Sequence, residues 1–228
     1  MTDYAFAARP TPSVAIDGSE LRFPVRRIFC VGRNYREHAR EMGGDPARDI
    51  PFFFTKPADA LVASGEEVPY PSRTANFHHE VELVVAVGRG GRDIAAADAV
   101  THLFGYAVGN DLTRRDLQLA ARAKGQPWDS SKGFDHSAVV GMIRPVERGH
   151  LTRGRIWLAV NDNLRQNADV ADMTWNVPEI IAELSGLFEL AAGDLIFTGT
   201  PAGVGPLTRG DRIEAGIEGL GSISNRIV

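Results

Sequence analysis

Residues 78–87 read HHEVELVVAV, a segment in which two glutamates begin an apolar run that ends at Gly88. The run 80–87 is rich in β-branched residues and predicts a buried β-strand. Side chains of a strand alternate between its two faces, so Glu80 and Glu82 are expected to point the same way. Two neighbouring carboxylates at the start of an apolar strand repel each other and lose hydration.

This pair of carboxylates has two interpretations. A hard divalent cation such as Mg²⁺ or Mn²⁺ would remove the repulsion, because it prefers oxygen ligands and keeps positions open for water or substrate. Alternatively, both side chains lie on a solvated face of the sheet. The spacing alone does not separate these two interpretations, so the rest of the chain must decide between them.

Composition narrows the class of protein. A chain of 228 residues predicts one large domain, or a domain with a small appendage, and its net charge of −4 gives no basic footprint for nucleic acid. No apolar run is long enough for a membrane span, and the N-terminus lacks the pattern of a signal peptide. The single cysteine, Cys30, lies in a buried-strand pattern and fits a reducing cytoplasm.

The remaining elements follow a mostly β pattern. Residues 1–25 are polar and contain prolines, which indicates an extended lead-in with a hairpin near Asp17. Strands are expected at 28–31, 104–111, 155–161 and 195–198, and helices at 33–42, 111–118 and 177–185. The glycine-rich loop 199–206 lacks the Lys-Ser/Thr ending of a phosphate-binding loop, so it does not support nucleotide binding.

Two groups of polar residues are candidates for a site. His38 and Glu41 are three residues apart and would share one face of a helix. Asp111, Arg115 and Gln118 follow the spacing of one helical face and could line a polar pocket. Taken alone, each group is more typical of a solvated surface. Lys132, in the predicted loop 128–135, indicates nothing by itself.

Taken together, these segments resemble the fumarylacetoacetate hydrolase family, and within it the short bacterial members that act on fumarylpyruvate and other acylpyruvates. The matching segments appear in the family's order and cover the chain from about residue 26 to its end. They are residues 31–35 with His38 and Glu41, residues 79–82, residues 105–111 with Asp116, residues 132–134 and residues 198–205.

The resemblance implies an α+β fold, a mixed β-sandwich roll with short flanking helices, in a catalytic domain of residues 26–228 that forms a homodimer. It implies Mg²⁺ or Mn²⁺ as cofactor and a small 2,4-dioxo acid as substrate. The implied metal ligands are Glu80, Glu82 and Asp111, and the implied catalytic residues are His38, Glu41 and Lys132. The implied substrate-binding residues are Arg33, Tyr35, Arg115, Gln118 and Thr200.

The implied reaction is hydrolysis of a carbon–carbon bond between two carbonyl groups, with fumarylpyruvate giving fumarate and pyruvate. Such a reaction needs a base for water, which suits His38 oriented by Glu41, and a cation for the developing enolate. Fumarylpyruvate also carries a second, distal carboxylate that needs a cationic partner or water. The sequence leaves that partner open among four cations: Arg33, Arg36, Arg122 and Lys124. Gly43 and Gly44 suggest that the segment around them closes as a lid.

Three alternatives remain at this point. The same site could decarboxylate oxaloacetate, or isomerise or hydrate a related oxo acid. A non-haem iron oxygenase could use His78 or His79 with Glu80, although adjacent histidines of a strand face opposite ways. A non-catalytic module that binds oxo acids would need no water-activating pair, so His38 and Glu41 argue against it.

Overall fold

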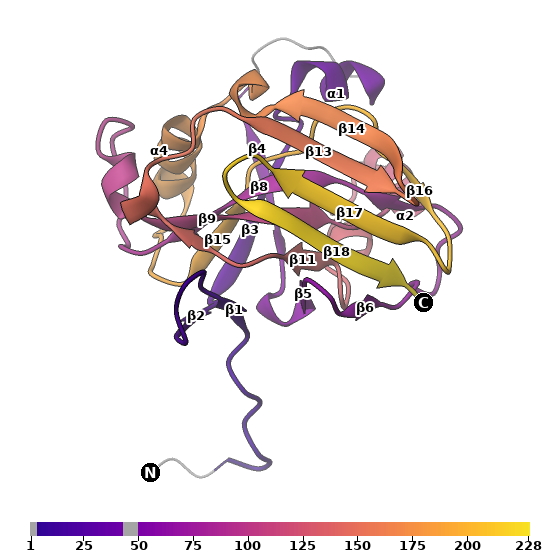
Figure 1. The fold of residues 1–228 in the computed structure, drawn as a ribbon, viewed down its shortest axis with the longest axis horizontal. Coiled ribbons are helices and arrows are strands. Elements are labelled where there is room, and N and C mark those ends of the chain that lie inside the picture. The colour runs from indigo at the N-terminus through magenta and orange to yellow at the C-terminus, as the bar shows by residue number, and fades with distance from the viewer. Residues whose placement is uncertain (1–3, 43–49) are drawn as a thin grey trace.

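Two β-sheets packed face to face form the body of the molecule, which the computed structural model describes for residues 4–42 and 50–228. In Figure 1 the smaller sheet, orange and yellow, lies in front of the larger one. The larger sheet consists, in spatial order, of β4 (Phe52–Lys56), β3 (Arg27–Gly32), β15 (Asp194–Phe197), β8 (Val81–Val87), β9 (Leu103–Asp111), β11 (Ala138–Val140) and β5 (Leu61–Ala63), with β12 (Arg144–Pro145) paired to β9. The smaller sheet consists of β14 (Asn163–Asp169), β13 (Arg155–Val160), β17 (Arg212–Ile217), β18 (Gly221–Ile227) and β6 (Glu67–Val68).

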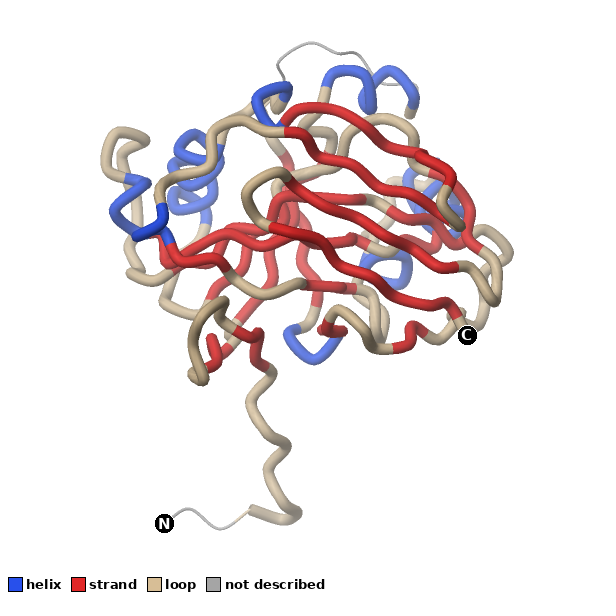
Figure 2. The backbone as a smooth tube through the Cα atoms, viewed as in Figure 1, coloured by secondary structure: helices blue, strands red, loops and turns tan. Residues whose placement is uncertain are grey.

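Both sheets are mixed, which confirms the expected class of fold. In the larger sheet β15 runs parallel to β3 and antiparallel to β8, and β11 runs parallel to β5. A three-stranded sheet of β10 (Thr113–Arg114), β7 (Phe77–His79) and β16 (Gly205–Leu207) stands beside them. Figure 2 shows that strands make up most of the body and that the helices, in blue, lie around it.

The alternation along β8 separates the two hydrophobic cores. Val81, Leu83 and Val85 belong to the cluster that includes the inward residues of the smaller sheet. Val84 and Ala86 belong to the cluster on the opposite face of the larger sheet. Period two therefore places Glu82 on the side of Val84, away from the core between the sheets.

The helices are short and sit at the edges of the sheets. They are α1 (Arg36–Glu41), α2 (Arg115–Ala123), α3 (Asp129–Lys132) and α4 (Val177–Leu187), with 3₁₀ turns at Ala58–Ala60, Ala99–His102, Val146–Arg148 and Val170–Asp172. The predicted helix 177–185 is confirmed: Asn176 and Glu179 cap its start reciprocally. None of the helices in the described part of the chain is long and apolar enough to cross a bilayer.

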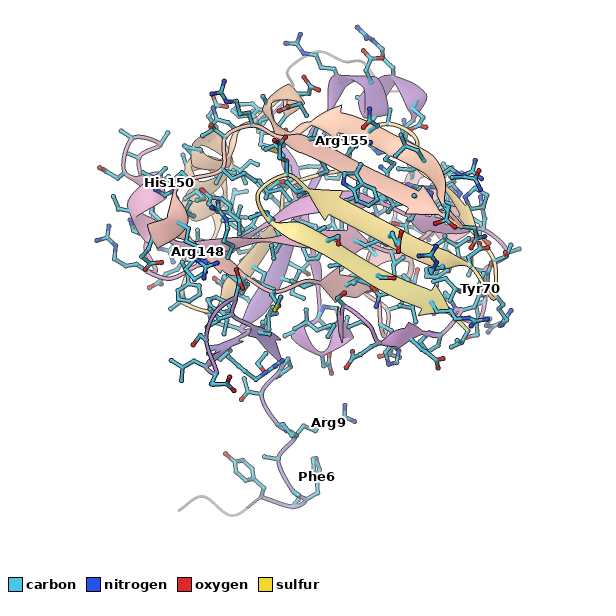
Figure 3. The ribbon with its side chains drawn as sticks, in the orientation of Figure 1. Phe6, Arg9, Tyr70, Arg148, His150 and Arg155 are labelled. Carbon is cyan, nitrogen blue, oxygen red and sulfur yellow. The ribbon has the colours of Figure 1, made fainter. Side chains whose placement is uncertain are left out.

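The N-terminal segment ends in the expected hairpin. Strands β1 (Ser13–Ala15) and β2 (Arg22–Pro24) pair antiparallel, and Val14 and Phe23 are buried against the larger sheet. Before the hairpin the chain runs away from the body, and Phe6 and Arg9 lie on this arm (Figure 3). The hairpin thus belongs to the packed body, whereas the arm does not.

Two predicted elements were wrong. Residues 111–118 do not form one helix: Asp111 ends β9, Thr113 pairs with His78 in β10, and α2 begins only at Arg115. The sheet pairing available to 113–114 outweighs their place in a helical pattern. Lys132 was expected in a loop but ends the short helix α3. The expected lid spans residues 35–50, and its central part, residues 43–49 with Gly43 and Gly44, lies outside the described residues.

Candidate active site

Three buried carboxylates meet because of the register between β8 and β9. Glu82 pairs with Gly109, so the antiparallel register brings Asp111 opposite Glu80, and the Asp111 amide donates to the Glu80 carbonyl oxygen at 2.8 Å. One oxygen from each of Glu80, Glu82 and Asp111 lies within 4.8 Å of the others. The expectation that the two glutamates point the same way is confirmed. The third acid, Asp111, lies at the end of the neighbouring strand β9.

Gly109 is needed at this pairing. A Cβ atom there would lie 2.4 Å from Val84 Cγ2 and 2.7 Å from Phe197 Cε1. Any larger residue would push β9 away from β8 and separate Asp111 from the glutamates. The glycine thus helps to fix the geometry of the carboxylate group.

Three cations contact two of the three acids. Lys132 Nζ donates to Glu80 Oε2 and to Asp111 Oδ2, each at 2.7 Å. Lys56 Nζ lies 2.8 Å from Asp111 Oδ1, and Arg115 pairs with Glu80. Lys132 and Lys56 are both buried. The cation Lys56 was not among the expected site residues, because the segment 51–57 around it is aromatic and predicts only a buried strand.

The charges around each glutamate drive their pKa values apart. Burial opposes ionisation of Glu80, but Lys132 and Arg115 outweigh it and lower the pKa of that carboxyl. The pKa of Glu82 is raised, first by burial and then by repulsion from Asp111 and Glu80. Its main hydrogen-bond donor is the Gly199 amide, at 2.7 Å. Glu82 therefore faces like charges, and no cation of residues 4–42 or 50–228 forms an ion pair with its carboxylate.

The expected His–Glu pair is formed at the end of α1. His38 Nδ1 donates to Glu41 Oε2 at 3.0 Å, and the His38 side chain is buried. Burial opposes ionisation of Glu41, but the hydrogen bonds from His38 and from the Gly203 amide lower its pKa. Because Nδ1 carries the proton in this bond, Nε2 is the basic nitrogen of the neutral ring.

The glycine-rich loop 199–206 supplies backbone hydrogen-bond donors to both the carboxylate group and the His–Glu pair. The Gly199 amide binds Glu82, and the Gly203 amide binds Glu41 at 3.1 Å. Both glycines have positive φ, and a Cβ on Gly203 would lie 2.1 Å from the Arg165 carbonyl oxygen. The sequence predicted this loop but not its function, because nothing in its pattern says which side chains its amides will face.

One cavity is lined by residues of both the carboxylate group and the His–Glu pair. Of the eleven residues expected at the site, nine line this cavity: Arg33, His38, Glu80, Glu82, Asp111, Arg115, Gln118, Lys132 and Thr200. Glu41 lies behind His38. Tyr35 lines a different hollow, and its hydroxyl is buried without a hydrogen-bond partner among the described residues. Its role in substrate binding stays a prediction.

The two histidines next to Glu80 are engaged elsewhere. His79 Nδ1 donates to Gln166 Oε1 at 3.0 Å, and His78 bonds Asn76 through Nε2 at 2.8 Å and Arg115 through Nδ1. Gln166 also donates to Thr200 Oγ1 at 2.8 Å, which ties the smaller sheet to the glycine-rich loop. These contacts leave no two-histidine arrangement around Glu80, so they argue against the iron oxygenase.

The fold and this cavity define a mixed β protein whose buried carboxylate group suits a divalent ion. The family model described as fumarylacetoacetate (FAA) hydrolase C-terminal matches residues 27–228. The chain belongs to the fumarylacetoacetate hydrolase family.

Individual relatives span nearly the same length. The chain is 46% identical over 180 residues to the fumarylpyruvate hydrolase of Ralstonia sp., covering 79% of this chain and 94% of that one. It superposes with a TM-score of 0.97 and 51% identity on the crystal structure of fumarylpyruvate hydrolase from Pseudomonas aeruginosa in complex with Mn²⁺ and pyruvate, covering 99% of each chain. It is 41% identical to the mitochondrial oxaloacetate tautomerase FAHD1 of Mus musculus, covering 89% of this chain and 91% of that one.

Proposed function

We propose that this protein is a metal-dependent hydrolase that cleaves fumarylpyruvate between its two carbonyl groups, giving fumarate and pyruvate. The observation that carries the proposal is one cavity that holds both a buried group of three carboxylates and a His–Glu pair. The similarity to the Ralstonia and Pseudomonas fumarylpyruvate hydrolases supports the choice of substrate.

The three carboxylates fit Mg²⁺ or Mn²⁺, which both prefer oxygen ligands. Glu80, Glu82 and Asp111 would hold the ion. Burial and the neighbouring acids raise the pKa of the Glu82 carboxyl, and a bound cation would offset both effects. When bound, the ion would supply Lewis-acid stabilisation of the negative charge that develops on the pyruvate half of the substrate. That the Pseudomonas enzyme was crystallised with Mn²⁺ and pyruvate supports this assignment.

The protein's own groups would supply the proton transfer. His38 Nε2 would accept a proton from water, and Glu41 would orient the ring and stabilise its charged form. Arg115 and Gln118, both buried and lining the cavity, would bind the substrate's oxygen atoms. Lys132 would add positive charge near the reacting carbonyl.

Turnover of a small panel of 2,4-dioxo acids tests the proposal. After chelator treatment and readdition of Mg²⁺ or Mn²⁺, fumarylpyruvate should give equimolar fumarate and pyruvate. Tautomerisation of oxaloacetate, without cleavage of any 2,4-dioxo acid, would favour the activity named for the mouse relative instead. Release of carbon dioxide from oxaloacetate would favour a decarboxylase.

Three further parts of the proposal depend on the resemblance and on the sequence. We expect a homodimer, which size-exclusion chromatography with light scattering would measure. We also expect a cytoplasmic location, with Cys30 buried and reduced, and a catalytic domain that begins at residue 26. Loss of activity on removal of residues 1–12, which precede the hairpin, would contradict that division of the chain.

A further inference from the structure

One face of α2 runs from the carboxylate group to the mouth of the cavity. Arg115, Gln118 and Arg122 are spaced by three and four residues, so they share this face, and all three line the cavity. Exposure changes along it: Arg115 and Gln118 are buried, whereas Arg122 is exposed. The helix therefore presents polar groups at increasing distance from Glu80, and the outermost of them is a cation.

We infer that Arg122 binds the distal carboxylate of the substrate and so selects acylpyruvates whose acyl group ends in an acid. The inference rests on the proposed function and names one residue within it. A carboxylate at the far end of the acyl chain needs a cationic partner, and a guanidinium can bind it through two parallel hydrogen bonds.

The length of the helix matches the length of such a substrate. At 1.5 Å per residue, Arg122 lies about 6 Å along α2 from Gln118 and about 10.5 Å from Arg115. An extended chain of seven carbon atoms, as in fumarylpyruvate, spans roughly 7–8 Å between its terminal carbons. With the pyruvate half at the carboxylate group, the distal acid would reach the level of Arg122.

The wall between the two ends is apolar. Leu119 on α2 and the aromatic rings of Phe54 and Trp128 line the same cavity, and those two rings lie 5.8 Å apart between centroids. Flat aromatic surfaces suit a planar, conjugated acyl chain. The cavity thus offers polar groups at its inner end, an apolar middle and a cation at its mouth.

The guanidinium of Arg122 is held in place by a single described bond. Its Nη1 donates to the Met42 carbonyl oxygen at 2.8 Å. An arginine carries five N–H donors, so this bond fixes the position of the head group and leaves other donors for a ligand. The carbonyl of Met42 thereby orients the cation across the mouth of the cavity.

The structure also separates Arg122 from the other three candidate cations. Arg36 lines a different hollow, and Lys124 is absent from the cavity lining. Arg33 lines the cavity from the end of β3, but it is not part of the α2 face, and its guanidinium carbon lies 5.8 Å from the centre of the Phe52 ring. Only Arg122 continues the line that begins at Arg115 and Gln118.

The test compares two substrates that differ in the distal acid. We expect Arg122→Met to lower kcat/KM for fumarylpyruvate by about 10- to 100-fold, the usual effect of losing a hydrogen bond to a charged group. Turnover of acetylpyruvate, which lacks that acid, should stay unchanged and shows that the variant is folded. Arg122→Lys should lose less, because it keeps the charge but not the paired geometry.

Lys124→Met is the matched control, since it removes one positive charge two residues away and outside the cavity. It should leave both substrates unchanged. A second measurement is inhibition by product: Arg122→Met should weaken inhibition by fumarate and leave inhibition by oxalate, which lacks a distal acid, as it was.

Three results would overturn the inference while leaving the proposed function intact. Equal losses for both substrates would mean that Arg122 acts through the structure of the cavity, and no loss would mean that it does not bind the acid. A selective loss in Arg33→Met alone would move the assignment to Arg33. Failure of the unmodified enzyme to cleave either substrate would instead overturn the proposed function, and the inference with it.

Discussion

Glu82 and Asp194 are both buried carboxylates at the ends of strands of the larger sheet, yet their surroundings differ. Asp194 accepts hydrogen bonds from Arg26 at 3.2 Å, from Arg27 at 3.1 Å and from the Ala191 amide at 2.9 Å. Glu82 accepts a hydrogen bond from the Gly199 amide at 2.7 Å, and burial followed by repulsion from Asp111 and Glu80 raises its pKa. Asp194 forms ion pairs with two arginines, whereas the nearest charged groups that raise the pKa of Glu82 are two further carboxylates.

This difference separates an acid that stabilises the fold from one that serves a site. The pairing of Asp194 follows from the register, because β15 runs parallel to β3 with Asp194 opposite Arg27. At the cavity, the cations in the described part of the chain contact Glu80 and Asp111, whereas Glu82 accepts a hydrogen bond from a backbone amide. A divalent ion would therefore relieve the most electrostatic repulsion at Glu82, where the described residues provide no paired cation.

The largest effect should come from Glu82→Gln. We expect metal-dependent turnover to fall on the order of 10⁴-fold, because a ligand of the ion is lost and with it several kcal/mol of transition-state stabilisation. The melting temperature of the metal-free protein should not fall, since the change removes a source of repulsion. Full metal-dependent activity in this variant would exclude Glu82 as a ligand.

The next effect distinguishes the carboxylate group from the His–Glu pair. His38→Ala should lower kcat by about 10²–10⁴-fold, the usual contribution of a general base, while metal affinity measured by calorimetry stays the same. Glu41→Gln should lower kcat less, because His38 keeps its nitrogen but loses the orienting charge. Turnover close to normal in His38→Ala would remove the pair from the mechanism.

The acids of the site could be predicted from the sequence, whereas the cations that pair with them could not all be predicted. The alternation in 80–87 was enough to place Glu80 and Glu82 on one side, because strand periodicity is local. It could not assign Lys56 to Asp111, since the two are brought together only by the order of strands in the sheet. The pairing of Asp194 with Arg26 and Arg27 could not be predicted from the sequence for the same reason.

The wrong prediction of a helix at residues 111–118 arose where a helical sequence pattern competes with pairing of strands in the sheet. Asp111 fits the spacing of the helix that contains Arg115, and it fits equally the end of the strand before it. The register with β8 decided for the strand, because the end of β9 pairs residue by residue with the start of β8 there. The backbone amides of Gly199 and Gly203 could not be foreseen as donors, since a backbone group leaves no signal in the sequence.

The stabilisation of the protein by a bound metal ion should depend on Glu82 and not on Asp194. At a metal concentration of about 100 times the dissociation constant, the free energy of unfolding should rise by about 2.7 kcal/mol. The increment should persist in Asp194→Asn and vanish in Glu82→Gln. Thermal unfolding with and without chelator measures it, and an equal increment in all three proteins would place the ion elsewhere.

The smallest effect is expected from Asp194→Asn on the metal-free protein. The change removes the charge that pairs with Arg26 and Arg27, and we expect the free energy of unfolding to fall by about 1–3 kcal/mol. The loss should stay below that of a fully buried pair, because the side chains of Arg26 and Arg27 remain 47% and 33% exposed and water can solvate them. Denaturant unfolding measures it, with the exposed Asp59→Asn as the control, for which we expect a change within about 0.5 kcal/mol. If Asp194→Asn instead kept its stability and lost metal-dependent turnover, Asp194 would belong to the site, and the contrast with Glu82 would fail.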